Sequence, residues 1–589
     1  MMRPLPRPRA RALASLVALT AVGLAGATVV TTPALSAAPA GDCATAFPVD
    51  QLAAGDAVTG LTVTHGTTPE GFTGEVLGVL NDGIGPGTDM VMVRLSSPEI
   101  DRVGIWEGMS GSPVYAADGR LIGAVAYGLA MGGSTVAGVT PYSAMQEHLS
   151  EAPGTVPVDR AAARTIARRT DVGVAAASGG FEQLAMPVGV AGVGAARLAA
   201  AERHAAGHRW LPRSTYAVGL ASPGAATADG IVAGGNLAAS LSYGDVTMAA
   251  VGTATSVCGD RVLGFGHPVE WRGATTLGLS PADAIYIQDD LVAGFKVANL
   301  GEPVGTITED RGTGIAGTLG SLPTTTEVSV TINRDGQSRT GVSHVALRTP
   351  DALASTTFYG LAADLQAVVD GPVTGSDEQS WTISGTDADG APFELSSSNL
   401  FSSEHDLTWR VGYEVGDLVY RLAHVPGISI DSIALTSDLA DAVPTYHVKG
   451  LQARQHGVWV PVGRRSPLLT RAGGTLAGRL VLASGGQERM VPFRLQVPDR
   501  LSGKVAFLAV LGGNSLGHSR PPRSVAKMGA WLDGLVRNDE VEVSLTGVGR
   551  GGGHVVYLGR HAVQLRTGEV LGPVDGVVKG HAFAPVMVQ

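Results

Sequence analysis

Ser110 has the sequence surroundings of a nucleophile. It stands in "EGMSGSPVYAADGRLIGAVAYG" (107–128), with Gly108 and Gly111 around it and Pro113 just beyond. A nucleophilic serine needs a sharp turn, so that its hydroxyl is exposed and backbone N–H groups converge on an oxyanion. Glycines allow that close approach. The stretch predicts either a catalytic serine, with the N–H groups of Gly108 and Ser110 as oxyanion donors, or only a β-hairpin with small residues at its corner.

His267 is the candidate base. In "LGFGHPVEW" it lies between Gly266 and Pro268, directly after an apolar run that predicts a strand. A histidine held at a strand end can present its ring to a cleft, and its ordinary pKa near neutrality suits proton transfer. The alternative is a structural or surface histidine with no catalytic role.

Taken together, the two segments resemble the SpoIVB-type serine peptidases. "EGMSGSPVYAADGRLIGAVAYG" is similar to the family's serine segment, and "SLSYGDVTMAAVGTATSVCGDRVLGFGHPV" (240–269) is similar to its histidine segment. The resemblance covers residues 50–150 and 214–335. It implies a trypsin-like fold of two small β-barrels with the active site between them. It also implies a cofactor-free endopeptidase in which Ser110 attacks a protein or peptide substrate and His267 is the base.

The chain departs from the family in the order of its halves and in its modules. Here the serine segment precedes the histidine segment, which suggests a circular permutation. A triad is defined by geometry and not by order along the chain, so this order is acceptable. The family's PDZ module has no counterpart in the sequence.

The third triad member is the weakest part of the resemblance. Where the family has an acid in a "TDP" context, this chain has "SSP" with Ser97. Asp245 in "YGDV" matches another aspartate of the family and is the tentative substitute. Asp89 and Asp101 are further candidates.

Three other motifs offer competing interpretations. A compact His65, Asp89 and Ser110 set is one alternative, but it leaves too few residues to build two barrels between its members. "GNSLG" (513–517) matches a nucleophile elbow, yet the prolines in "HSRPPR" prevent the helix that should follow. "DADG" (387–390) lacks the distal glutamate of a calcium loop and predicts a hairpin turn. We expect no metal site.

The N-terminus and the cysteines point to export. Residues 1–40 carry four arginines, an apolar run and small residues in the order of a signal peptide, although the run could also remain as a membrane anchor. Two cysteines in an exported chain favour a Cys43–Cys258 disulfide. The formal net charge of −10, without clustered Lys or Arg, argues against a nucleic-acid partner.

Composition and turn spacing predict a mainly β protein of several domains. The expected segments share one feature, a change of patterning at each boundary: 1–40 signal peptide, 44–150 serine half, 151–213 helical connector, 214–345 histidine half, 346–424 helix plus β linker, 425–500 immunoglobulin-like sandwich and 501–589 C-terminal α+β region.

The sequence thus favours a secreted or cell-envelope serine endopeptidase. The C-terminal β-sandwich-type domains would position substrate or dock on the envelope. The alternative is a non-catalytic secreted binding or structural protein that keeps the peptidase shell.

Overall fold

The computed structural model describes the chain from Cys43 onward, in ten stretches: 43–129, 133–147, 155–184, 187–205, 207–290, 294–455, 457–463, 466–513, 524–547 and 566–589. The expected signal peptide and "GNSLG" beyond Gly513 therefore lie outside the described residues. Within these stretches, no helix combines the length and the apolar character needed to cross a membrane.

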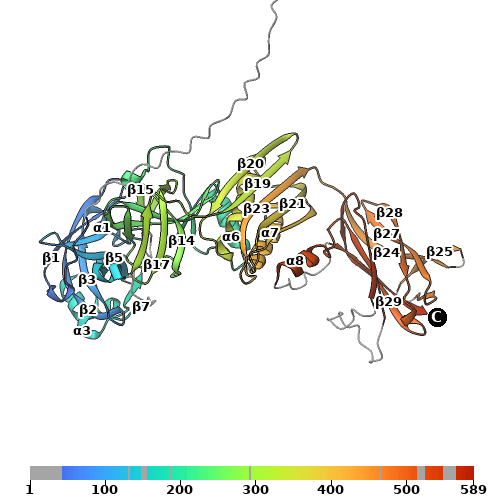
Figure 1. The fold of residues 1–589 in the computed structure, drawn as a ribbon, viewed down its shortest axis with the longest axis horizontal. Helices are drawn as coiled ribbons and strands as arrows, with labels where there is room; N and C mark the ends of the chain where they lie inside the picture. Colours follow the sequence, from blue (N-terminus) through green and yellow to red (C-terminus); the bar gives the residue numbers. More distant parts are fainter. Residues whose placement is uncertain are drawn as a thin grey trace, which may run out of the picture. The chain divides into compact units, whose positions relative to one another are not determined.

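The serine half forms a closed six-stranded antiparallel barrel, in blue to cyan in Figure 1. Its strands pair in the order β1-β2-β3-β6-β5-β4, and β4 pairs back to β1. Short helices α1 and α2 follow the third and sixth strands. The elements are β1 (Ala57–Thr62), β2 (Glu70–Gly85), β3 (Thr88–Ser96), α1 (Pro98–Val103), β4 (Pro113–Ala116), β5 (Leu121–Leu129), β6 (Val136–Pro141) and α2 (Tyr142–Glu147).

The histidine half forms a second closed six-stranded antiparallel barrel. Its order, β11-β12-β13-β18-β17-β14 with β14 paired back to β11, repeats that of the first barrel. A hairpin, β15–β16, is inserted between its fourth and fifth strands. The expected double β-barrel is therefore confirmed. The strands are β11 (Asn236–Gly244), β12 (Thr247–Cys258), β13 (Arg261–Gly264), β14 (Gly273–Ser280), β15 (Ala282–Gln288), β16 (Phe295–Leu300), β17 (Gly305–Arg311) and β18 (Gly314–Leu319).

The two Ala- and Arg-rich stretches of the connector, 158–170 and 194–210, contain helices α3 and α5. Short strands that the helical prediction did not include lie outside these stretches. β8 and β7 extend the first barrel's sheet beyond β5, and β9 and β10 extend the second sheet beyond β12. The elements are β7 (Thr155–Val156), α3 (Arg160–Arg169), α4 (Val174–Ala177), β8 (Phe181–Gln183), β9 (Val188–Ala191), α5 (Ala195–His204) and β10 (Thr215–Ala217).

An α+β unit follows the second barrel and replaces the expected linker at 346–424. Its sheet order is β20-β19-β23-β21-β22, continuous with β11 of the barrel, and α6 packs against α7 and β19. Thr349 caps α6 by accepting from the Ala352 N–H, and Pro350 begins the helix. The elements are β19 (Thr326–Arg334), β20 (Gln337–Val345), α6 (Pro350–Val369), β21 (Gly375–Thr386), β22 (Pro392–Ser403), α7 (Thr408–Ala423) and β23 (Ser429–Ala440).

The C-terminal strands form two five-stranded sheets, one ordered β25-β24-β27-β28 with β32 on β24, the other β26-β33-β29-β30-β31. Both sheets contribute to one apolar core, for example Leu451 and Leu480 from one and Leu508 and Val543 from the other. The expected boundaries at 425 and 500 are therefore wrong, because β23 pairs with β19 and β21, and strands beyond 500 share the core of those before it. The elements are β24 (Thr445–Gln455), β25 (Val458–Val462), β26 (Leu468–Thr470), β27 (Thr475–Ser484), β28 (Gln487–Gln496), β29 (Val505–Gly512), α8 (Val525–Leu532), β30 (Val541–Gly547), β31 (Arg566–Leu571), β32 (Val577–Lys579) and β33 (His581–Val588).

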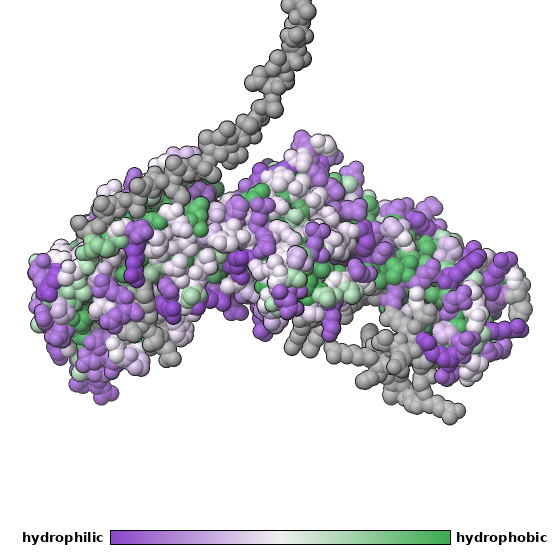
Figure 2. Space-filling model, in the orientation of Figure 1, coloured by the Kyte–Doolittle hydropathy of each residue, from purple (hydrophilic) through white to green (hydrophobic). Residues whose placement is uncertain are grey.

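The predicted Cys43–Cys258 disulfide is present and joins the first described residue to the end of β12. Residues after Cys43 then run along the first barrel, where Phe47 N–H donates to Leu121 O and Leu121 N–H to Thr45 O. The bridge therefore ties this segment to both barrels. On the face drawn in Figure 2, hydrophilic and hydrophobic residues are interleaved, as on most protein surfaces.

Candidate active site

Ser110 and His267 meet between the two barrels. Nε2 of His267 lies 2.7 Å from Oγ of Ser110, and both side chains are fully buried. Each residue comes from the same place in its barrel, the connection from the third strand to the fourth: β3 to β4 for Ser110 and β13 to β14 for His267. Because the two barrels share one strand order, equivalent loops of the two halves supply the two groups.

The turn around Ser110 depends on its two glycines. Gly108 and Gly111 both have φ of +96°, in the region that L side chains rarely adopt. Gly111 N–H donates to Val125 O at 2.8 Å, and Ser112 N–H donates to Met109 O at 3.0 Å, so the turn is anchored on β5. A Cβ at Gly111 would lie 1.8 Å from the carbonyl oxygen of Thr253. The glycine is therefore needed both for its backbone angle and for contact with the second barrel.

Strand β12 of the second barrel holds the serine turn by hydrogen bonds to its backbone carbonyls. Thr253 N–H donates to Ser110 O at 2.8 Å, and Thr253 Oγ1 donates to Gly108 O at 3.1 Å. Thr255 Oγ1 donates to Gly111 O at 2.8 Å. Sequence reasoning missed these threonines; their spacing of two in "GTATS" places both on one face of β12, which is the signal that could have found them.

Two N–H groups remain available beside Ser110. Among the described residues, neither Gly108 N–H nor Ser110 N–H donates a backbone hydrogen bond, whereas the carbonyls of both residues accept from Thr253. Free N–H groups on either side of a nucleophile are what an oxyanion hole requires. The two predicted oxyanion donors therefore bond to no backbone carbonyl of the described residues and can donate to a substrate oxyanion.

The orientation of His267 is set by a backbone carbonyl. Nδ1 lies 2.8 Å from the carbonyl oxygen of Pro268, and a carbonyl can only accept. The Nδ1 atom therefore carries the proton, and Nε2 of the neutral ring accepts from Ser110 Oγ–H. Burial lowers the pKa of His267 to about 4, so the ring is neutral, as a general base must be, at any pH well above that value.

The loop after His267 is held by Asp310, a buried carboxylate on β17. It accepts from three backbone donors of this loop, Val269 N–H at 2.8 Å, Glu270 N–H at 2.9 Å and Arg272 N–H at 3.2 Å. Val269 N–H belongs to the same peptide unit as the Pro268 carbonyl that accepts from His267. A carboxylate on the N–H end polarises that peptide and makes its oxygen a better acceptor.

Known proteins add nothing to this geometry. Comparison of the chain with models of protein families, with curated proteins and with solved structures finds no match. The site must therefore be interpreted from its own residues.

Asp245, the tentative third member, is not brought to His267. It precedes Ala254 by nine residues, and Ala254 pairs with Gly264 at the end of β13, so roughly 30 Å of strand separates Asp245 from the histidine loop. Its Oδ2 accepts from Arg339 Nη2 at 2.7 Å, and Arg339 also pairs with Asp364. Asp245 instead lines a separate cavity of about 540 Å³.

The other candidate acids make local contacts. Asp89 accepts from Asp82 N–H in the β2–β3 hairpin at 2.9 Å, and Asp101 on α1 accepts from Ser96 Oγ at 3.1 Å. Asp387 accepts from Asp389 N–H and Ala391 N–H, as a hairpin turn requires. Within the described stretches, no three His, Cys, Asp or Glu side chains are placed to share a metal ion.

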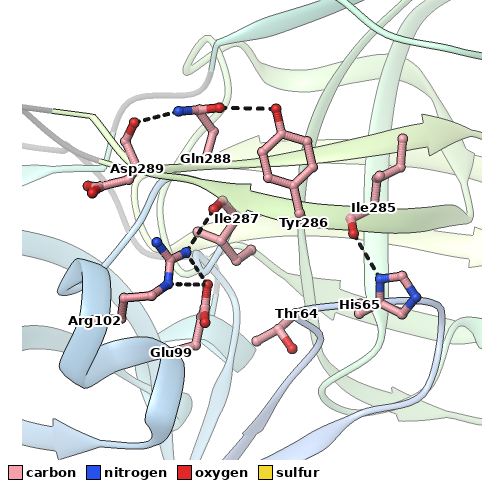
Figure 3. Close-up of a pocket in the computed structure, with 9 residues that line it drawn as sticks. All are labelled: Thr64, His65, Glu99, Arg102, Ile285, Tyr286, Ile287, Gln288 and Asp289. Carbon is pink, nitrogen blue, oxygen red and sulfur yellow. Dashed lines mark hydrogen bonds and ion pairs between the residues drawn. The ribbon is translucent and has the colours of Figure 1, made fainter.

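His65 faces a different cavity, of about 460 Å³, drawn in Figure 3. Its Nδ1 lies 2.8 Å from the carbonyl oxygen of Ile285, and because a carbonyl can only accept, Nδ1 is the donor. Arg102 pairs with Glu99 and donates to Ile287 O at 3.0 Å in the same cavity (Figure 3). Ser110 and Asp89 are not among the lining residues, so the compact His65, Asp89 and Ser110 set does not form.

Proposed function

We propose that this protein is an exported serine endopeptidase. The observation that carries the proposal is the 2.7 Å contact between Ser110 Oγ and His267 Nε2, with Nδ1–H held by Pro268 O. A nucleophile, a base in hydrogen-bond reach and a group that orients the base form the constellation of nucleophilic catalysis. The Cys43–Cys258 disulfide supports an oxidising compartment.

The first half-reaction follows from this geometry. His267 Nε2 takes the Ser110 hydroxyl proton while Oγ attacks the scissile carbonyl carbon. The tetrahedral oxyanion accepts from the N–H groups of Gly108 and Ser110. His267 then gives the proton to the leaving amine nitrogen, the C–N bond breaks, and the acyl group remains on Ser110.

Water completes the second half-reaction. His267 takes a proton from water, the oxygen attacks the acyl carbon, and the proton returns to Ser110 as the carboxylic acid leaves. In this mechanism Asp310 takes no proton; it holds the loop that carries Pro268 and so keeps the imidazole in the Nδ1–H tautomer. The order of the halves, serine before histidine, supports a permuted version of the SpoIVB-type arrangement.

Labelling by a fluorophosphonate probe tests the proposal. We expect the folded chain to be labelled, Ser110→Ala and His267→Ala to lose labelling, and hydrolysis of denatured casein to fall roughly 10⁴-fold or more in both variants. Ser112→Ala is the matched control, because this neighbouring serine bonds to Thr62 Oγ1 and not to the histidine. It should be labelled as the parent is.

A non-catalytic binding or structural protein is the second candidate. The complete burial of Ser110 and His267 favours it, and so does the bond of His267 Nδ1 to a backbone carbonyl in place of a carboxylate. Absence of labelling in every folded variant, including those with an opened cleft described below, would establish this alternative.

A further inference from the structure

The short strand β8 lies on β5 and contacts the loop that carries His267. It pairs antiparallel with the end of β5, where Tyr127 is opposite Gln183, Gly128 opposite Glu182 and Leu129 opposite Phe181. Immediately beyond, Leu184 N–H donates to Ala126 O at 3.1 Å. The preceding residue on β5, Val125, accepts from Gly111 N–H in the serine turn. Leu184 therefore continues the line of β8 along β5, and its partner Ala126 is next to the residue that anchors the serine turn.

The side chain of Leu184 is buried among apolar side chains of the first barrel. It is 6 % exposed and belongs to the same buried cluster as Trp106 and Met109, the latter adjacent to Ser110 in the chain. A Cβ at Gly128 would lie only 3.1 Å from Leu184 Cδ2, so the glycine makes room for the leucine on the β5 edge. The space that Leu184 fills, here called its pocket, is thus apolar and bounded on one side by Gly128.

Gln183 contacts the histidine side of the cleft. Its Nε2 donates at 3.1 Å to Pro268 O, the same oxygen that accepts from His267 Nδ1. Residues 181–184 therefore bond to β5 next to the residue that anchors the serine turn, through Leu184 N–H, and to the histidine loop, through Gln183.

We propose that residues 181–184 occupy the cleft as a substrate backbone would, with Leu184 in the place of the residue whose carbonyl is attacked. Addition of an extended peptide to a sheet edge is a general mode of recognition, with backbone bonds for affinity and a pocket for specificity. This inference rests on the proposed function and deepens it: substrates bind as an added strand on β5 with a leucine-like residue in the pocket. The chain's own segment must leave before they enter.

Two substitutions at Glu182 test this occupancy without entering the apolar core, because that side chain is exposed. Leu184 N–H donates to Ala126 O, so by the alternation of antiparallel ladders the next bonded pair is Glu182 with Gly128. Glu182→Pro removes that donor and should release the segment. Glu182→Gln keeps the donor and is the matched control.

The expected result is at least a tenfold faster fluorophosphonate labelling of Glu182→Pro than of the parent, with Glu182→Gln equal to the parent. Peptides with leucine on the acyl side of the cut should be hydrolysed at least tenfold faster than peptides with aspartate or lysine there. Equal labelling of all three proteins, with labelling still lost in Ser110→Ala, would overturn the occupancy and leave the proposed function standing.

A binding measurement separates this inference from catalysis. In the Ser110→Ala background, we expect the fluorescent peptide Phe-Glu-Gln-Leu to bind Glu182→Pro at least tenfold more tightly than Glu182→Gln, by anisotropy. A peptide ending in aspartate should bind neither. Circular dichroism checks that both proteins are folded. Equal binding of the leucine peptide to both folded proteins, or binding to neither, would contradict the proposal whether or not the enzyme is active.

Discussion

The Nδ1 atom of His267 lies 2.8 Å from the carbonyl oxygen of Pro268, its own neighbour in the chain. The orienting group is thus a peptide and not a carboxylate side chain. The nearest acid in the hydrogen-bond network is Asp310, one peptide unit away through Val269 N–H. This arrangement makes the role of Asp310 testable against that of Asp245.

Asp310→Asn should lower kcat about 10- to 100-fold with little change in KM. The asparagine amide has only one oxygen to accept from the three loop N–H groups, and its NH₂ group faces N–H donors that it cannot bond. The loop that carries Pro268 therefore shifts. Each lost charge-assisted bond is worth about 1.5–3 kcal/mol. Steady-state kinetics on a leucine peptide, combined with the NMR shift of the His267 Nδ1 proton, measures this effect.

Asp245→Asn is the matched control, because it removes the same charge, here from the ion pair with Arg339, at a position far from the histidine. It should leave kcat and the Nδ1 proton shift unchanged. An equal loss of kcat in both variants, without a change in the proton shift for Asp310→Asn, would reduce Asp310 to a general structural role.

Stability should fall as the pH is lowered from about 6.5 to about 4. His267 has a pKa of about 4 in the folded chain and about 6.5 when unfolded, so the unfolded state binds more protons between these values. The contribution of the neutral, buried His267 to the free energy of unfolding is on the order of 3 kcal/mol. It is complete above pH 6.5 and is lost as the pH falls toward 4. Urea unfolding at pH 7 and pH 4.5 measures it, and His267→Gln should show a smaller difference between the two pH values.

The same lowered pKa of His267 predicts the pH profile of activity. The acid limb of kcat/KM reports the base of the free enzyme, so we expect it nearer pH 4 than pH 6.5. A limb at pH 6.5 or above in the parent would show that the imidazole is hydrated in the reacting enzyme, contrary to its burial here.

Gly111→Ala should prevent assembly of the site, whereas Gly119→Ala should be tolerated. Both glycines have positive φ, +96° and +84°, so each substitution costs about 1–2 kcal/mol of backbone strain. At Gly111 the new Cβ would also meet Thr253 O at 1.8 Å, whereas at Gly119 it meets nothing within 4 Å. Thermal unfolding of both variants separates the two effects, because Gly119→Ala introduces backbone strain alone and Gly111→Ala adds the steric clash with Thr253. Equal Tm values would contradict the close packing of the barrels at Gly111.

Removal of the disulfide should destabilise the chain without altering the catalytic contact. The bridge closes a loop with a sequence separation of 215 residues, for which the chain-entropy model gives about 5 kcal/mol as an upper figure. The Cys43→Ser and Cys258→Ser double variant should unfold at lower urea concentration yet keep fluorophosphonate labelling under native conditions. An unchanged urea midpoint would show that the bridge contributes little beyond local order.

The local sequence carried much of the barrel architecture. Alternating apolar residues bounded by glycine and aspartate indicated the strands, and "AADG" indicated the β4–β5 hairpin, because side-chain period and turn chemistry are local properties. The helix expected at 350–370 is α6, begun by Thr349 and Pro350. The domain boundaries failed where strands pair across long separations, as β19 does with β23, since a pairing partner leaves no local signature.

For the site, the sequence by itself determined the two groups that we propose as nucleophile and base, and the glycines that let them approach: Ser110 and His267 stand in turns whose residue types are specific. Only the tertiary structure decided what steadies the histidine and what lies in the cleft. The Pro268 carbonyl, Asp310 and β8 act through backbone hydrogen bonds between distant segments, and nearly any residue can supply a backbone group. Such contacts depend on how the barrels close and pack, and so they become visible only in the folded chain.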